Sequence, residues 1–172
     1  MLIRKPIMPT ACALLIELIL VASATGKPNF TGTWIRDTVS SDAFTAVVVP
    51  LIGPGQNSPG HNFRLHINHR NKHLQIAAEQ DGKRPAVADY DLGRGWHSSV
   101  DQKIEREFGG TRYRSKWRGD ILVLEKYVAF RGNFRTSGGN MEQRWDLSPG
   151  GDVLTITTTI DRFTTREVFS RK

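Results

Sequence analysis

The chain has 172 residues, with 24 Lys and Arg against 17 Asp and Glu and a formal net charge of +7. Hydrophobic residues make up 38% of it, which is enough for a core and argues against wholesale disorder. A single cysteine excludes a disulfide scaffold and any multi-cysteine zinc or iron–sulfur site. The length predicts one domain of ordinary size, or one domain plus a removable segment.

Residues 1–24 have the pattern of a secretory signal peptide. Arg4 and Lys5 give a positive start, an apolar run covers residues 11–24, and small residues end it at Ala24. The run is too short and too interrupted for a membrane span. We expect cleavage after Ala24, which leaves a secreted or periplasmic chain with no cysteine and no transmembrane span. The alternatives are an uncleaved anchor or a mis-assigned start.

From residue 27 onward, apolar and polar residues alternate with a period of two, as in strands with one buried face. The alternation is clear over residues 63–68, 74–79 and 112–117, and the Thr-rich run 155–159 favours extended backbone. Turn-forming groups separate the runs at Asn71-Lys72, Asp81-Gly82, Gly109-Gly110, Gly119-Asp120, Gly138-Gly139 and Pro149-Gly150-Gly151.

About eight to ten strands over residues 27–172 predict one all-β domain, either an antiparallel barrel or a sandwich. A closed barrel is favoured because it removes edge strands, which an exported protein without disulfides must protect. Two segments break the pattern. Residues 38–49 leave room for a short helix, and the Pro/Gly-rich segment 50–60 predicts a long irregular loop at the mouth of the barrel.

The sequence Phe30-Thr31-Gly32-Thr33-Trp34 resembles the opening Gly-x-Trp signature of lipocalins and fatty-acid-binding proteins, the calycin group. In that group the tryptophan sits on the first strand and closes one end of the barrel, so the resemblance implies a structural barrel-end motif at Gly32 and Trp34. In lipocalins a late arginine packs over this tryptophan, a role that Arg166 or Arg171 would fill here. In intracellular fatty-acid carriers an arginine and a tyrosine two positions later grip the carboxylate. Val168 stands at the tyrosine position after Arg166, which argues against that site.

A closer resemblance is to a class of small exported bacterial proteins of unassigned function with lipocalin-like character. The matching motifs are the Phe-x-Gly-Thr-Trp opening, an Ile-x-His hairpin over residues 67–74, a Trp-x-Gly-x-x-Leu hairpin over 117–122 and a Trp-x-Leu-Ser-x-x-Gly-x-x-Leu-Thr-Ile segment over 145–156. They span nearly the whole chain after the signal. The resemblance implies a single antiparallel lipocalin-like barrel and says almost nothing about a ligand.

Cationic residues occupy alternate positions of one predicted strand, so they line one of its faces: Arg112, Arg114, Lys116 and Arg118. This basic face suits phosphates, sulfated sugars or an anionic envelope surface. The alternative is a solvated face balanced by counter-charges such as Glu105 and Glu107. Nucleic acid is not an expected partner of an exported chain.

Five histidines raise the question of a metal site: His61, His66, His69, His73 and His97. On one strand His66 and His69 point to opposite faces, and no carboxylate stands at suggestive spacing beside them. His69 and His73 flank a turn and are able to approach across a hairpin. We expect no metal and no cofactor.

Catalytic patterns are absent from the sequence. There is no Gly-x-Ser-x-Gly elbow, no cysteine after signal cleavage and no Gly-rich phosphate loop before a helix. The carboxylate pairs Glu105 with Glu107 and Asp89 with Asp91 are common on exposed strands. We assign no catalytic residue and expect no enzyme, while a hydrolase or isomerase on the same barrel stays open.

Two residues are candidate ligand contacts. Trp96 lies between Gly93-Arg94-Gly95 and His97, so it either packs in the core, as most tryptophans do, or stacks on a ligand at the barrel mouth. Arg166 is the other.

The sequence therefore predicts a carrier that binds a small, partly apolar or amphiphilic molecule in its barrel. The alternative is an envelope structural or interaction module, filled by side chains, that uses the basic face. Oligomeric state is not predicted.

Overall fold

A computed structural model of the chain describes residues 26–42, 63–82, 84–98, 111–131 and 136–172. The predicted signal at 1–24, the loop at 50–60, Gly109-Gly110 and most of segment 38–49 lie outside these ranges. The described residues contain ten strands and no helix: β1 Gly32–Asp37, β2 Phe63–Arg70, β3 His73–Gln80, β4 Ala86–Asp91, β5 His97–Ser98, β6 Thr111–Arg118, β7 Ile121–Arg131, β8 Thr136–Leu147, β9 Val153–Ile160 and β10 Phe163–Arg171. The predicted all-β barrel is confirmed.

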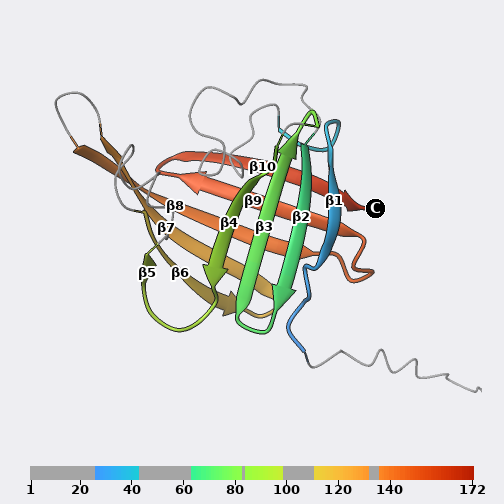
Figure 1. Cartoon of the computed structure of the whole chain (residues 1–172), viewed down its shortest axis with the longest axis horizontal. Coiled ribbons are helices and arrows are strands. Elements are labelled where there is room, and N and C mark those ends of the chain that lie inside the picture. Colours follow the sequence, from blue (N-terminus) through green and yellow to red (C-terminus); the bar gives the residue numbers. More distant parts are fainter. Residues whose placement is uncertain (1–25, 43–62, 83, 99–110, 132–135) are drawn as a thin grey trace, which may run out of the picture.

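All strand pairs are antiparallel, and the strands form one sheet in the order β4-β3-β2-β1-β10-β9-β8-β7-β6-β5. Figure 1 shows this sheet bent on itself, so that β1 to β4 cross in front of the layer formed by β6 to β10. The barrel is nearly closed. Its two sheet edges are β4 and the two-residue strand β5.

The chain ends close the sheet at its centre, where β1 pairs with both β2 and β10. Trp34 lies opposite Leu65 on one side and Arg171 on the other. The backbone N–H of Lys172 donates to the carbonyl oxygen of Thr33 at 2.9 Å. The first and last strands are thus hydrogen-bonded together, which makes the fold dependent on its last residues.

Tight turns follow the predicted chemistry. Asn71, Asp81 and Gly82 have φ values of 52°, 50° and 71°, and Gly119 has 59°. Such left-handed conformations are the ones that Gly, Asn and Asp adopt with least cost in two-residue hairpins. The predicted turns at these positions and at Pro149-Gly150-Gly151 are confirmed.

Gly138-Gly139 was predicted as a turn, and this is wrong. Both glycines lie inside β8, where Gly138 pairs with Ala129 and Gly139 with Val128 of β7. The long β7–β8 ladder supplies backbone hydrogen bonds that override the local preference of a glycine pair. A turn that the sequence did not reveal lies at Asp161-Arg162, where Asp161 has φ 53°.

One end of the barrel is closed by aromatic side chains. Trp34 and Trp145 are fully buried, and Phe30 lies between Trp145 and Trp117 with ring centroids 5.8 and 6.1 Å away. Trp34 Nε1 donates to the carbonyl oxygen of Phe30 at 2.9 Å, and the Arg171 guanidinium covers its indole at 4.5 Å. Of the two arginines proposed for this position, Arg171 occupies it.

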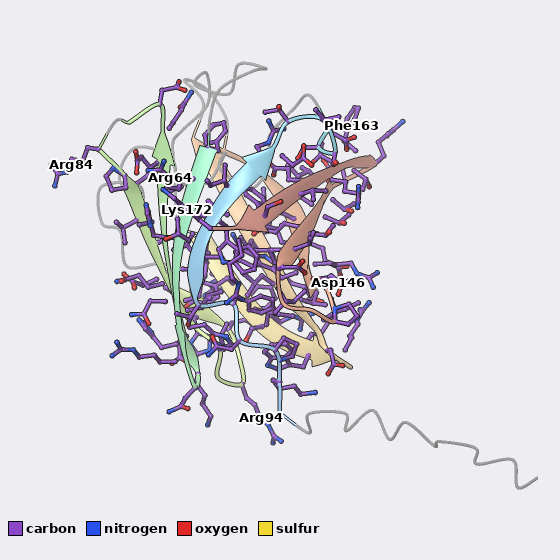
Figure 2. The ribbon with its side chains drawn as sticks, turned by 90° about the vertical axis from the view of Figure 1, so that its right-hand side faces the viewer. Arg64, Arg84, Arg94, Asp146, Phe163 and Lys172 are labelled. Atoms are coloured by element: carbon purple, nitrogen blue, oxygen red, sulfur yellow. The ribbon has the colours of Figure 1, made fainter. Side chains whose placement is uncertain are left out.

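Gly32 belongs to the same barrel-end motif for a conformational reason. Its φ is 152°, which side chains other than hydrogen rarely adopt, and an added Cβ would lie 3.6 Å from Trp34 Nε1 and 3.8 Å from the Arg171 guanidinium carbon. Figure 2 shows side chains crowding the space between the two layers, while the labelled Arg64, Asp146 and Phe163 project outward. The Gly-x-Trp signature therefore has two physical reasons: Gly32 adopts a backbone conformation that other residues rarely adopt, and the Trp34 indole packs beside it.

Trp34→Ala tests the importance of this closed end. Deleting a fully buried indole removes apolar contacts and leaves a cavity, so we expect the free energy of unfolding to fall by about 3–5 kcal/mol. The matched control is Trp96→Ala, because Trp96 is 52% exposed and should change stability by less than ~1 kcal/mol. Urea unfolding followed by circular dichroism measures both. Equal losses would contradict the assignment.

Candidate functional site

The interior of the barrel has two chemically different halves. Around Trp34 and Trp145 the inward side chains are large and apolar. Toward the β3–β4 and β9–β10 turns the inward positions become polar. This polar half comprises Arg36, Gln80, Lys126, Gln143, Thr158, Thr165 and Glu167. The small inward residues Ala78 and Ala88 lie in the register rows of Trp34 and Gly32 and pack in the apolar cluster. Buried polar groups require polar partners.

Three polar groups of this half lie side by side across adjacent strands. Gln143 on β8 pairs in register with Thr158 on β9, which pairs with Thr165 on β10. The Gln143 amide donates to Thr158 Oγ1 at 3.3 Å, and both side chains are 1% exposed. Thr165 Oγ1 is buried without a hydrogen-bond partner among the described residues. A row of this kind can offer donors and acceptors to an enclosed polar molecule or to water.

A buried ion pair lies beside this row. The Arg36 guanidinium Nε is 3.5 Å from Glu167 Oε1, with both side chains at most 3% exposed. Arg36 on β1 faces Phe169 on β10, so the pair joins the two strands that close the sheet. Its guanidinium also donates to the carbonyl oxygen of Asp42. Burial of two charges is tolerated only when each has such partners.

Lys126 is the second buried cationic residue of the polar half. Its side chain, on β7, is 3% exposed, and Nζ donates to the hydroxyl of Tyr90 on β4 at 2.8 Å. Nζ also lies 4.6 Å from the centroid of the Tyr90 ring. Among the described residues no carboxylate lies within ion-pair distance of Nζ. Burial therefore lowers the pKa of Lys126 to about 7, and burial also raises the pKa of Tyr90.

Tyrosine side chains bridge the two edges of the sheet at this place. Tyr90 and Tyr113 meet edge to face with centroids 5.1 Å apart, although they belong to β4 and β6. The Asp91 backbone N–H donates to the Tyr113 hydroxyl at 2.8 Å. No strand pairing joins β4 to β5 or β6 in the described part of the chain. Side chains, with Lys126 among them, thus close the barrel where ladder hydrogen bonds do not.

The basic face lies on the outside of the barrel. Arg112, Arg114 and Arg118 are exposed, and Lys116 is half-buried, in alternation with the inward Tyr113. These four side chains therefore share the outer face of β6. Its counter-charge among the described residues is Glu125 on β7, which bonds to both Arg114 and Lys116. These two cations lower the pKa of the Glu125 carboxyl.

The charges expected to balance this face, Glu105 and Glu107, lie outside the described residues. Arg112 and Arg118 have no carboxylate within ion-pair distance in the described part of the chain. Arg144 on β8, also exposed, is opposite Val123, which is opposite Lys116. On β8, Arg144 lies between the outward carboxylates Glu142 and Asp146, so the cations of this face without a described counter-charge are those of β6.

Trp96 is exposed, so the core interpretation of this residue is wrong. It lies in the connection between β4 and β5 and is 52% exposed, with the Arg114 guanidinium 4.9 Å from its ring centroid. It borders an open hollow of about 500 Å³ that is also lined by the row Arg114, Glu125, Glu142 and Thr159 and by Lys126 and Met141. A Gly-rich approach to Trp96 leaves it without strand partners that would bury it.

Arg166, the other sequence candidate, points away from the interior. Its side chain is exposed and donates to the carbonyl oxygen of Ser40 at 3.3 Å, and its backbone N–H donates to Asp42 Oδ2 at 2.6 Å. It neither covers Trp34 nor reaches the polar half. Its observed contacts fasten the segment after β1 to β10.

The four described histidines do not converge, and His61 lies outside the described residues. His66 is exposed on the outer face and His69 is buried at the closed end, as strand alternation predicts. His69 and His73 do not approach each other, since His73 lies outside near Asp89 at 3.4 Å. Burial lowers the pKa of His69. Among the described residues, no three groups of His, Cys, Asp or Glu gather as metal ligands.

Sequence reasoning missed Lys126, Arg36, Glu167 and Gln143. The alternation of inward and outward residues along β7 could have revealed Lys126. Leu122, Leu124 and Lys126 share one face of this strand, so the lysine stands at a position where the pattern predicts a buried apolar residue. A charged residue in the buried phase of a strand is expensive and therefore informative. Its tyrosine partner lies 36 positions earlier in the chain, a separation that no local pattern indicates.

No protein-family model and no curated protein matches the sequence. Solved structures do match the fold. Two secretory abundant heat soluble proteins from Ramazzottius varieornatus have TM-scores of 0.59 and 0.60 at 15% and 17% identity, over 86% of this chain and 97–98% of theirs. Fatty-acid-binding protein 1 from Echinococcus granulosus has a TM-score of 0.54 at 12% identity, over 83% of this chain and 96% of its own. The fold is therefore that of fatty-acid-binding-type barrels. No described helix is long and apolar enough to cross a membrane.

The Lys126 amine should make stability depend on pH. Its pKa falls from 10.5 in the unfolded chain to about 7 in the folded chain, so between these values only the unfolded state binds the proton. The free energy of unfolding should then rise by about 1 kcal/mol per pH unit between pH 7.5 and 9.5. Lys126→Met should flatten this rise and stabilise the protein at pH 7.

Urea unfolding across this pH range measures the effect, and Lys116→Met, on the outer face, is the control. Parallel curves for the protein and the Lys126→Met variant would contradict the assignment of a buried amine.

Proposed function

We propose that the chain is an exported, non-enzymatic carrier or sequestering protein that binds a small amphiphile inside its barrel. The polar half carries the proposal. Gln143, Thr158 and Lys126 offer polar contacts there, and the neighbouring apolar cluster includes the small Ala78 and Ala88, beside which a ligand would find room. A ligand with an apolar body and one polar group complements an interior that is apolar at one end and polar at the other.

The comparisons support binding in general terms. Structures that share this fold include proteins described as fatty-acid-binding proteins and a fatty acid transporter. The Arg-x-Tyr pair of intracellular carriers is missing, and Arg166 points outward. The ligand proposed here therefore contacts Lys126, Gln143 and Thr158. In intracellular carriers, an arginine and a tyrosine on the last strand make the corresponding polar contacts. Export rests on the signal pattern of residues 1–24.

Filling the interior tests this function. Ala88→Phe introduces a large ring on the inward face of β4, and we expect binding of an environment-sensitive amphiphilic dye to weaken at least ~10-fold, because the ring takes the space of the ligand. Val87→Phe is the matched control, since the neighbouring Val87 is 52% exposed on the outer face. Circular dichroism checks that both variants fold. Equal dye binding by both would contradict an internal site.

A second candidate function is docking of the basic face to an anionic envelope surface, favoured by the uncompensated cations Arg112 and Arg118. The double variant Arg112→Glu/Arg118→Glu should weaken binding to vesicles that contain anionic lipid at least ~10-fold. Binding by the unaltered protein should fall steeply with salt. Arg64→Glu/Arg84→Glu, a charge-matched change on β2 and in the β3–β4 connection, is the control. Loss in both double variants would indicate a net-charge effect without a specific face.

A further inference from the structure

Lys126 stands in an unusual setting for a lysine. The side chain is 3% exposed, lies on the inner face of β7 between the register partners Tyr113 and Met141, and has Tyr90 as its hydrogen-bond partner. Buried lysines are commonly paired with a carboxylate, and none of the described carboxylates lies within 4 Å. The described contacts of Lys126 therefore do not support a role in stabilising the fold through an ion pair.

The contact with Tyr90 leaves the amine ready to react. Nζ donates to the phenol oxygen at 2.8 Å, and loss of a proton from the ammonium gives the amine the lone pair that attacks a carbonyl carbon. Burial raises the pKa of the Tyr90 phenol, which keeps it protonated and able to donate to the amine or to an oxygen beside it. A nucleophile and a proton donor therefore lie in hydrogen-bond contact inside the barrel.

Burial also keeps much of the amine unprotonated near neutral pH, since it lowers the pKa of Lys126 to about 7. An uncharged amine in apolar surroundings is the reactive form of lysine in imine-forming proteins. Lys116, by contrast, is half-buried on the outer face and bonds to the Glu125 carboxylate.

We infer that Lys126 captures amphiphilic aldehydes as a reversible imine, with Tyr90 as the proton donor. This inference rests on the proposed function, because the aldehyde must first enter the barrel. The amine nitrogen bonds to the carbonyl carbon and gives a carbinolamine. The Tyr90 hydroxyl protonates the departing oxygen, water leaves, and the iminium nitrogen returns its proton to the phenolate. One aldehyde and one amine give one imine and one water, with no oxidant or reductant.

Reductive trapping tests the inference. The purified protein is incubated with tetradecanal and sodium cyanoborohydride, and intact-mass and peptide mass spectrometry locate the adduct. We expect one alkyl chain per protein, located at Lys126. Total adduct formation should be at least ~10-fold faster in the unaltered protein than in Lys126→Met. Tyr90→Phe should slow trapping by ~10-fold or more beyond any change that it causes in tetradecanol binding, which is measured in parallel. Lys116→Met, on the outer face, should trap at the original rate.

A second measurement separates this inference from the function on which it rests. Tetradecanol and tetradecanoate compete with an amphiphilic dye for the protein without any covalent step. If both displace the dye and tetradecanol slows trapping, the adduct forms at the internal site. If they displace the dye but adducts scatter over surface lysines at equal rates in Lys126→Met, the imine inference is overturned and the carrier function stands. If neither displaces the dye, the carrier function itself fails.

Discussion

The packing of Trp34 is the interaction on which the rest of the fold depends. This indole donates to the Phe30 carbonyl and lies beneath the Arg171 guanidinium, so it holds the beginning and the end of the chain against each other. Because β1 pairs with both β2 and β10, the same contact joins the two layers at the centre of the sheet. Because large apolar side chains close this end of the barrel, the inward positions at the other end need not form the apolar core. They hold polar side chains instead.

The two halves of the interior divide the residues that stabilise the barrel from those of the proposed binding site. Apolar burial around Trp145 contributes to stability in proportion to area. The ion pair of Arg36 with Glu167 and the buried Lys126 oppose it, because charges are costly to remove from water. Stability optimisation alone would replace these groups with apolar residues. These charged groups lie on the inner face of the barrel, away from the packed apolar end. For this reason we propose that the ligand binds in the polar half.

Period-two alternation and turn chemistry predicted the strands and most of the hairpins from sequence, and the Gly-x-Trp signature predicted the closed end. The errors arose where long-range contacts override local preference. Gly138-Gly139 is held in β8 by its ladder with β7, and Trp96 is exposed because the connection that carries it is not covered. The Lys126–Tyr90 contact joins β7 to the edge strand β4, which are not neighbours in the sheet. Such closure depends on curvature, which a pattern of residues along one strand does not encode.

The most direct test of the central claim is a nuclear magnetic resonance titration of the isotope-labelled protein with tetradecanol. Ligand binding in the polar half predicts chemical-shift changes at the Gln143 and Gln80 side-chain amides and at the Thr158 methyl group, with the Trp34 indole N–H unmoved. Changes confined to the Trp96 indole and the Arg114 guanidinium, with none at Gln143, would contradict the account and place binding on the outer face.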